Sequence, residues 1–454
     1  MPLARFVLEN YRCFRTRQEV ELRPITVVLG KNNSGKSALV RAPLVLRTGI
    51  RTMSPLPFDL DQLGESGPDF LDLVHGRNPH GRIGVRLDFE REGVRPHSLS
   101  ATVQNVDEWG YQLVSSLAIE PDSKYTHIGW DEDDPDRADW PRRHELKDGH
   151  AYFVSNGEDD VSRIRLPFYG LLPAIRHDQA YDAVYDTTEA DRLDQSEDID
   201  LDQLIEAIAI IRSEFDDIRY LSPYRERPRR VYRFRSRRPA TVVGANGESA
   251  LDIVAHDELR RRSGLLNRLN GYLDDNISGW KLGIQHHEEG VYSAVMRSTF
   301  DGKLEVSLAD AGTGVTQLLP ILVQRAVDAV MPPEQPTLEI IEEPELHLHP
   351  SAHARLADLF MAAAQESNVR FLIETHSETF MLRLRRRIAE GAIAPDDVAI
   401  YFVEHEGGVA NARRIGIDQL GNLDYWPRGV FAEDFEETRA LAAAQIERSE
   451  ADAG

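Results

Sequence analysis

The sequence predicts an α/β protein built around a parallel β-sheet, and three observations lead to this fold class. Residues 25–29 (ITVVL) form a continuous run of β-branched and aliphatic side chains, which is typical of a strand buried on both faces. A glycine-rich segment, GKNNSGKS (30–37), follows that strand directly and precedes a predicted helix. Residues 337–341 (TLEII) form a second buried strand that runs into carboxylates.

The remaining elements are predicted from periodicity and turn residues. In the N-terminal part we expect strands at 3–9, 18–22, 82–89 and 99–104, and a helix from about residue 37. In the middle we expect helices at about 201–215 and 249–276, and strands near 281–286 and 291–298. In the C-terminal third we expect helices at 314–330, 351–366 and 377–390, strands at 370–374 and 398–404, and an Ala/Glu-rich helix in the tail. The acidic segments 131–136 and 187–202 are expected to be solvated loops.

Composition excludes several classes of protein. The 454 residues include 76 acidic and 53 basic ones, for a net charge of −23, so any contact with nucleic acid must come from a local basic surface. The single cysteine, Cys13, excludes an intramolecular disulfide and a cysteine-rich zinc site. Apolar runs are too short to span a membrane, and charges interrupt the first apolar stretch, so we expect no signal peptide and a cytoplasmic protein.

The segment GKNNSGKS has the G-x-x-x-x-G-K-S pattern of a phosphate-binding P-loop, in the strand–loop–helix context that such a loop requires. Backbone N–H groups of the loop and the helix N-terminus would cradle phosphates, Lys36 would reach the β- and γ-phosphates, and Ser37 would offer a hydroxyl to Mg²⁺. The predicted nucleotide-binding residues here are Gly30, Lys31, Asn32, Asn33, Ser34, Gly35, Lys36 and Ser37.

A P-loop needs a distant carboxylate for the metal, and LEIIEEPE (338–345) supplies two adjacent ones. Glu342 stands where a metal-binding acid belongs, and Glu343 could polarise the attacking water. After the next predicted strand, the imidazole of His376 in ETHSE (374–378) could contact a γ-phosphate or that water. A strand that merely ends in solvated glutamates is the competing interpretation.

Three further histidines, His347, His349 and His353, lie close together in the sequence and raise the alternative of a zinc site. We favour an ordinary loop ahead of a helix that starts at Pro350, because no cysteine or further acid completes a tetrahedral ligand set.

The order of these motifs, with LADAGTGVTQLLPIL (308–322) between them, resembles the ABC-class ATPase heads of the SMC, RecF and OLD (overcoming lysogenisation defect) families. The resemblance covers most of residues 1–90 and 300–405. It implies a P-loop NTPase of the ABC/SMC-head type with a mixed α/β insertion, ATP and Mg²⁺ as cofactors, and a head-to-tail dimer or higher homo-oligomer.

Residue by residue, the resemblance makes Glu342 the Walker B acid, Glu343 the catalytic glutamate and His376 the switch histidine. It also implies a signature loop that binds the γ-phosphate held by a second copy, formed by Asp310, Gly312, Thr313, Gly314 and Gln317. Glu345, Leu346 and His347 fall in the D-loop position. A Q-loop would fall near 70–77, where Gln62 is the nearest preceding glutamine.

The resemblance divides the chain into four predicted parts: 1–90 and 301–405 for the ATPase head, 91–300 for an insertion, and 406–454 for a C-terminal element. The tail (424–437) looks like that of bacterial, defence-associated OLD-like ATPases. Unlike SMC proteins, the chain has no sustained heptads, and unlike OLD nucleases it leaves too few residues after 404 for a TOPRIM domain.

Residues 225–238 contain eight arginines interleaved with aromatic residues. This composition suits contact with DNA, docking on an acidic partner, or a structural segment that pairs with the chain's own acidic loops. The resemblance to defence-associated OLD-like ATPases implies an ATPase that acts as a sensor or scaffold in anti-phage defence and controls a separately encoded effector, such as a nuclease or toxin. The alternative is a DNA repair or recombination ATPase of the RecF/SMC type that binds DNA directly.

Overall fold

The computed structural model describes residues 3–426 and 439–445 together with residue 448, apart from 65–66, 92–93, 108–109, 121–125, 131–149, 156–160, 175–200, 216, 235–239, 262–263 and 277–278. The acidic loop expected at 131–136, and residues 187–200 of the second one, lie outside the described residues. Residues 439–445 are helical, as expected for the Ala/Glu-rich tail.

A six-stranded sheet forms the centre of the molecule, in the order β12-β17-β18-β3-β19-β20, and is parallel except for β20. Its strands are β3 (Ile25–Gly30), β12 (Asp217–Leu221), β17 (Thr337–Glu342), β18 (Val369–Glu374), β19 (Val398–Glu406) and β20 (Val409–Ile415). Successive residues of β3 face two different cores, with Val28 in one and Val27 and Leu29 in the other. This burial on both faces explains the continuous apolar run.

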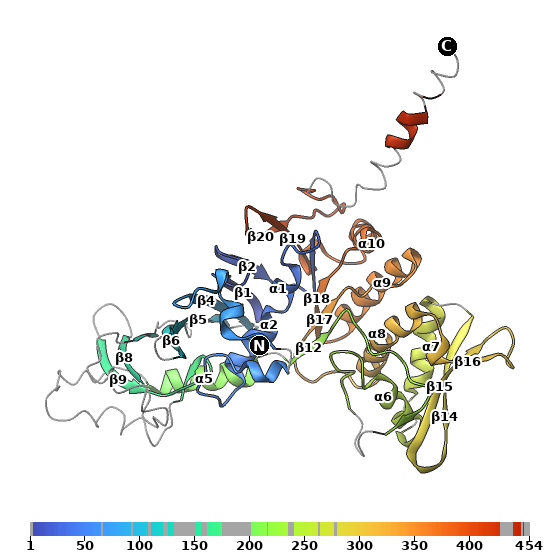
Figure 1. Ribbon diagram of the computed structural model, residues 1–454, viewed down its shortest axis with the longest axis horizontal. Coiled ribbons are helices and arrows are strands. Elements are labelled where there is room, and N and C mark those ends of the chain that lie inside the picture. The colour runs from blue at the N-terminus through green and yellow to red at the C-terminus, as the bar shows by residue number, and fades with distance from the viewer. Residues whose placement is uncertain are drawn as a thin grey trace.

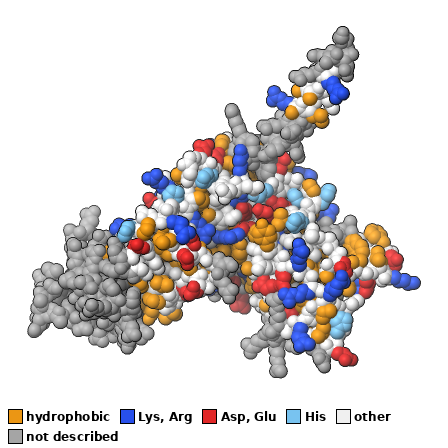
Figure 2. Space-filling view, viewed as in Figure 1, with side chains coloured by type: hydrophobic (Ala, Val, Ile, Leu, Met, Phe, Trp, Pro, Cys, Tyr) orange, Lys and Arg blue, Asp and Glu red, His pale blue; other side chains and the backbone are white. Residues whose placement is uncertain are grey.

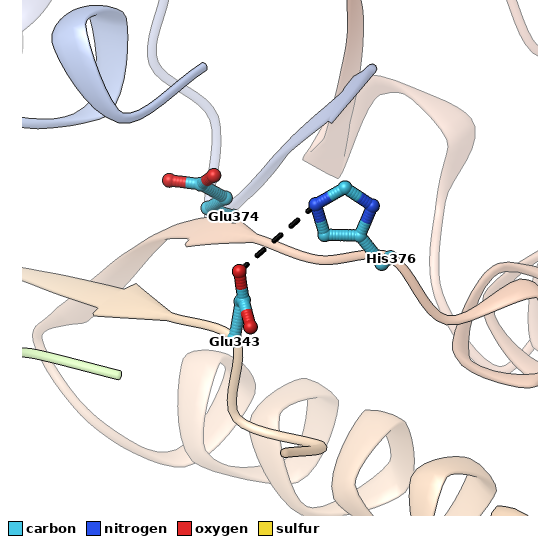
Figure 3. A group of neighbouring side chains, drawn as sticks. All are labelled: Glu343, Glu374 and His376. Atoms are coloured by element: carbon cyan, nitrogen blue, oxygen red, sulfur yellow. Dashed lines mark ion pairs between the residues drawn. The ribbon is translucent and has the colours of Figure 1, made fainter. Parts of the chain in front are cut away.

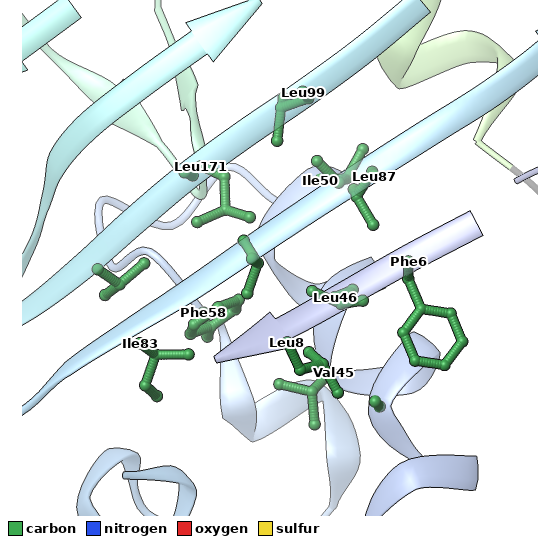
Figure 4. Close-up of a cluster of buried hydrophobic side chains, with 14 of the residues drawn as sticks. Phe6, Leu8, Val45, Leu46, Ile50, Phe58, Ile83, Leu87, Leu99 and Leu171 are labelled. Carbon is green, nitrogen blue, oxygen red and sulfur yellow. The ribbon is translucent and has the colours of Figure 1, made fainter. Parts of the chain in front are cut away.

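An antiparallel sheet of eight strands, ordered β2-β1-β4-β5-β6-β7-β8-β9, packs against one side of the central sheet. Its strands are β1 (Leu3–Glu9), β2 (Gln18–Glu21), β4 (Arg82–Arg91), β5 (Val94–Val106), β6 (Tyr111–Glu120), β7 (Thr126–Trp130), β8 (His150–Ser155) and β9 (Val161–Leu166). Helix α2 (Ala42–Ile50) fills the space between the sheets, where Leu46 and Ile50 meet Leu8 and Leu87 (Figure 4). This core holds α2, the second helix after the P-loop, against the eight-stranded sheet.

Helices cover the other face of the central sheet, and a small third sheet lies beyond them (Figure 1). The helices of this face are α6 (Ala250–His256), α7 (Leu265–Asn276), α8 (Thr313–Val330), α9 (Pro350–Glu366) and α10 (Glu378–Ala389). The core beside the eight-stranded sheet also includes α1 (Lys36–Val40), α3 (Phe70–Leu73) and α5 (Leu201–Glu214). The third sheet consists of β13 (Tyr232–Arg233), β14 (Trp280–His286), β15 (Val291–Ser298) and β16 (Glu305–Ser307), and β10 (Phe168–Tyr169) pairs with β11 (Leu172–Pro173). The eight-stranded sheet and the third sheet lie at opposite ends of the long axis, with the central sheet between them.

Two predicted helices are interrupted. The helix expected over 249–276 is two helices, α6 and α7, and Gly264 takes a left-handed φ of +87° just before α7 begins. The helix after the P-loop breaks at Arg41, because Pro43 has no N–H to donate to the carbonyl four residues earlier. Strands β12 and β20 were not predicted individually. The helices of the described part of the chain are each too short or too polar to span a lipid bilayer.

The candidate nucleotide site

Three neighbouring strands end at the same edge of the central sheet and bring the predicted motifs together. Strand β18 lies between β17 and β3, with Glu374 in register with Glu342 on one side and with Val28 on the other. The P-loop follows β3, so its first helical turn lies over the carboxyl ends of β17 and β18. The sequence motifs at 30–37, 342–343 and 374–376 therefore form one site.

The P-loop has the backbone geometry that its glycines permit. Gly30 has a φ of +155° and Gly35 a φ of +107°, and a Cβ at Gly35 would lie 2.4 Å from the sulfur of Cys13. The hydroxyl of Ser34 is buried without a hydrogen-bond partner. The ammonium of Lys36 donates to the carbonyl of Lys31 at 2.7 Å, and its burial lowers its pKa. An unpartnered hydroxyl and a desolvated ammonium both suit a bound phosphate.

Glu342 is buried, and both of its oxygens are engaged. The guanidinium of Arg41 donates to them at 2.5 and 2.6 Å, and the hydroxyl of Tyr220 donates to Oε1 at 3.1 Å. The break between α1 and α2 presents Arg41 to this strand end. The expected metal-binding acid is thus held in a bidentate ion pair.

Glu374 is a residue of the site to which the sequence analysis gave no role. Its Oε1 accepts a hydrogen bond from the Ser37 hydroxyl at 3.0 Å and lies 3.8 Å from the Lys36 ammonium, while its Oε2 is buried without a partner. Burial, together with the negative charge of Glu342, raises the pKa of Glu374 to about 7. Its place at the end of an apolar strand, as the first residue of ETHSE, was the available signal.

Glu343 and His376 face each other across the opening of the site (Figure 3). Glu343 Oε1 lies 4.0 Å from His376 Nε2, and about a third of each side chain is exposed. Glu343 has a left-handed φ of +44°, and its N–H donates to the carbonyl of Glu374 at 2.8 Å, which turns its carboxylate out of the sheet. Burial and the charge of Lys36 lower the pKa of His376 to about 4, so the imidazole is neutral at pH 7.

Two buried charged residues hold these loops in place. Glu345 Oε1 accepts from the Thr375 hydroxyl at 2.8 Å and from the His376 N–H at 2.6 Å. Arg225, from the arginine-rich segment, donates to the carbonyls of Glu342 and Glu343 at 3.1 and 3.2 Å and to Gln317 at 3.3 Å. Burial lowers the pKa of Arg225 to about 10, so it remains charged at neutral pH.

The predicted signature loop is accessible at the start of α8. Asp310, Gly312 and Thr313 are exposed, and the Cβ position of Gly312 faces open space. A Cβ at Gly314, by contrast, would lie 2.9 Å from the carbonyl of His347 in the same chain. The absence of a side chain at Gly314 is therefore required by the chain's own segment at His347 and Leu348. Asp310 forms a bidentate pair with Arg230 at 2.7 and 2.8 Å.

Two of the three histidines in the histidine-rich segment, His349 and His353, make contacts within their own chain. His349 Nδ1 accepts the N–H of Ser351 at the start of α9, and His353 contacts Leu348 and Ser377. Among the residues that the structure describes, the group with the geometry to hold a metal is Glu343, Glu374 and His376, whose ligand atoms lie within 4.8 Å of one another.

Gln62, the nearest glutamine before the expected Q-loop position, contacts its own chain. The amide of Gln62 donates to Asp59 at 2.8 Å and to the carbonyl of Arg51 at 3.2 Å, beside the C-terminal end of α2. It therefore belongs to the packing around α2, and the place of a Q-loop stays a prediction.

The described arginines of the 225–238 segment largely contact their own chain. Arg225 is buried, Arg229 pairs with Glu226, and Arg230 pairs with Asp310. On the face drawn in Figure 2, basic side chains are interspersed with acidic ones. Glu226 and Asp310 lie outside the two acidic loops, so pairing of this segment with those loops stays a prediction, as do its contacts with DNA or with an acidic partner.

The donors at this edge suit Mg²⁺. The hydroxyl of Ser37 and the carboxylates of Glu374 and Glu343 are hard oxygen ligands, and Glu374 Oε2 is an unpartnered buried acceptor. When bound, Mg²⁺ would neutralise phosphate charge beside Lys36.

Solved structures with similarity to this chain include SMC heads. The SMC head bound to the C-winged helix domain of ScpA is 12% identical, with a TM-score of 0.48, 92% of this chain covered and 98% of that chain. The SMC head domain from Thermotoga maritima is 13% identical, with a TM-score of 0.39 and coverages of 92% and 100%. The Pyrococcus furiosus SMC head bound to the C-terminal domain of ScpA is 10% identical, with a TM-score of 0.40 and coverages of 91% and 96%. The curated proteins include no match to this sequence.

Sequence families give a broader match. The profile described as "AAA ATPase domain" matches residues 1–48, and "Protein of unknown function (DUF3696)" matches residues 393–441. A third profile spans residues 25–382, from the P-loop strand through His376 to α10. The P-loop NTPase fold expected from the sequence is confirmed, and the chain belongs to the AAA ATPase family described as "AAA domain, putative AbiEii toxin, Type IV TA system".

Proposed function

We propose that this chain binds ATP with Mg²⁺ at the edge formed by β17, β18 and β3, and hydrolyses it between two copies arranged head to tail. The observation that carries the proposal is the convergence of Lys36 and Ser37 with Glu343 and His376 at adjacent strand ends. The exposed loop of Gly312 and Thr313 supports the second half, because it is available to a partner's phosphates.

The chemistry follows from the opposed side chains. A water between Glu343 and His376 would lose its proton to the Glu343 carboxylate as its oxygen attacks the γ-phosphorus. The bond from that phosphorus to the bridging oxygen breaks, and ADP departs with the electron pair. The neutral imidazole of His376 can orient the water or donate to a γ-phosphate oxygen, and Lys36 neutralises charge on the phosphates.

We further propose that ATP turnover makes the protein a sensor or scaffold in an OLD-like, bacterial anti-phage defence system that controls a separate effector. The family description, which names a toxin and a Type IV TA system, supports this role. The alternative is a DNA repair ATPase of the RecF/SMC type. The self-pairing of Arg229 and Arg230 favours the first role, because it leaves less free positive charge for DNA.

The catalytic assignment is tested by Glu343→Gln. We expect ATP binding to be retained, phosphate release to fall by about 10²-fold or more, and an ATP-bound dimer to accumulate. Phosphate release and size-exclusion chromatography with light scattering measure these effects. Lys36→Ala is the comparison variant, and it should instead lose nucleotide binding. Wild-type turnover in Glu343→Gln would refute the assignment.

A further inference from the structure

The two buried glutamates at the ends of β17 and β18 differ in how their oxygens are engaged. Both Glu342 oxygens accept short hydrogen bonds from Arg41, and one also accepts from Tyr220. To bind a cation, the buried Glu342 carboxylate would have to release its bidentate ion pair with the partly exposed Arg41 and leave that guanidinium unpaired beside the incoming positive charge. Breaking such a pair is costly, and the displaced guanidinium would repel the cation.

Glu374 has the opposite environment. One oxygen accepts from the Ser37 hydroxyl, and the other is buried with no partner, on a residue that is only 3% exposed. An ionised carboxylate with a buried oxygen that has no donor is unfavourable unless a cation reaches it. Strand order explains the position: β18 lies directly beside the P-loop strand, whereas β17 lies one strand further away.

We infer that Glu374, and not Glu342, is the carboxylate that works with Ser37 to hold the divalent cation of the nucleotide. Ligand atoms of Glu343 and His376 lie within 4.8 Å of Glu374 and complete the site on its open side. The oxygen donors suit Mg²⁺, and the added imidazole makes Mn²⁺ a suitable probe. Glu342 is then a structural residue that ties α1 to β17 through Arg41. The inference deepens the proposed function and rests on nucleotide binding at the P-loop.

The test compares two isosteric variants, Glu374→Gln and Glu342→Gln, with Glu374→Asp as a variant that keeps the charge. The first measurement is the affinity for a fluorescent ATP analogue with Mg²⁺ and with a chelator. Mg²⁺ should tighten binding by wild type and by Glu342→Gln. Glu374→Gln should lose this gain. Its affinity for the analogue should be the same with Mg²⁺ and with the chelator, and in Mg²⁺ it should be about tenfold or more below that of wild type. Glu374→Asp should recover part of the gain, which a merely structural role would not produce.

The second measurement is Mn²⁺ binding without nucleotide, followed by electron paramagnetic resonance, with thermal melts to verify folding. Weaker Mn²⁺ binding in Glu374→Gln than in Glu342→Gln is expected. A full Mg²⁺ gain in Glu374→Gln, or its loss in Glu342→Gln alone, overturns the inference. If wild type binds Mn²⁺ and Glu374→Gln does not, but wild type binds no nucleotide, the proposed function is refuted and the cation site at Glu374 is supported. Wild type that binds neither would refute both.

Discussion

Glu374→Gln should stabilise the nucleotide-free, metal-free protein at alkaline pH. Burial holds the pKa of Glu374 near 7 in the folded chain, against an ordinary value of 4.5. Because the folded state holds this proton more tightly than the unfolded state, raising the pH from about 4.5 to 7 favours unfolding. Above about pH 7 the folded protein carries the full cost of an ionised, buried carboxylate. Glutamine has the same shape and carries no such cost.

The magnitude follows from the displacement of the pKa. A difference of about 2.5 pH units corresponds to about 3 kcal/mol at 1.36 kcal/mol per unit, as an upper bound. At ~2.1 cal/mol/K of unfolding entropy per residue, this free-energy difference raises the Tm by about 3 °C if the 454 residues unfold as one cooperative unit. The gain should be full at pH 8 and should vanish as the pH falls towards 5.

Thermal melts of both proteins between pH 5 and 8, in the presence of a chelator, measure this difference. Glu366→Gln is the matched control, since it removes the same charge from an exposed position at the end of α9. The control should show no gain that grows with pH. A Glu374→Gln protein less stable than wild type at pH 8, or one whose gain is equal at pH 5 and pH 8, would refute the reasoning.

Three other outcomes are expected. Arg225→Ala should lower the free energy of unfolding by about 2–4 kcal/mol in denaturant melts, because it removes a buried guanidinium from two loop carbonyls and Gln317, and an unchanged melt would contradict this. A mixture of the Gly312→Arg and Lys36→Ala proteins should regain part of the ATPase activity that each protein lacks alone, because in a mixed dimer both defects can fall in one composite site and leave the other intact. No recovery at any ratio of the two proteins counts against the head-to-tail arrangement. Replacing Arg229, Arg230 and Arg233 with alanine should lower the free energy of unfolding by about 1 kcal/mol or less for each exposed ion pair that is lost, and should leave DNA gel shifts unchanged. If wild type binds DNA with a steep salt dependence that this variant loses, the repair role is favoured.

The parts of the site that were predictable from sequence are those with local signatures. The P-loop needs Gly30 and Gly35 at fixed spacing for backbone reasons, and Glu343 and His376 each follow a recognisable buried strand. The order of α8, β17, α9, β18 and α10 was predicted because helical and strand periodicities alternate clearly there.

The undetected parts depend on contacts between distant segments. Arg41 reaches Glu342 only because the helix breaks before Pro43, and Tyr220 joins them only because β12 pairs with β17. The role of Glu374 depends on β18 lying between β17 and β3, a sheet order that no local pattern specifies. Arg225 is one of eight arginines in its segment, and nothing in the sequence distinguished it as a buried residue.

The position of β3 in the central sheet has a consequence for biosynthesis. Its two neighbours, β18 and β19, lie at residues 369–374 and 398–406, so more than three hundred residues must leave the ribosome before the P-loop strand can pair on either edge. Until then β3 is an apolar segment with two open edges, which favours slow folding and association with other nascent chains. A fragment that contains only the P-loop and the first sheet would lack both partners of β3. The chain should therefore acquire nucleotide affinity only late in synthesis, and the nascent protein should depend on chaperones that shield exposed strands.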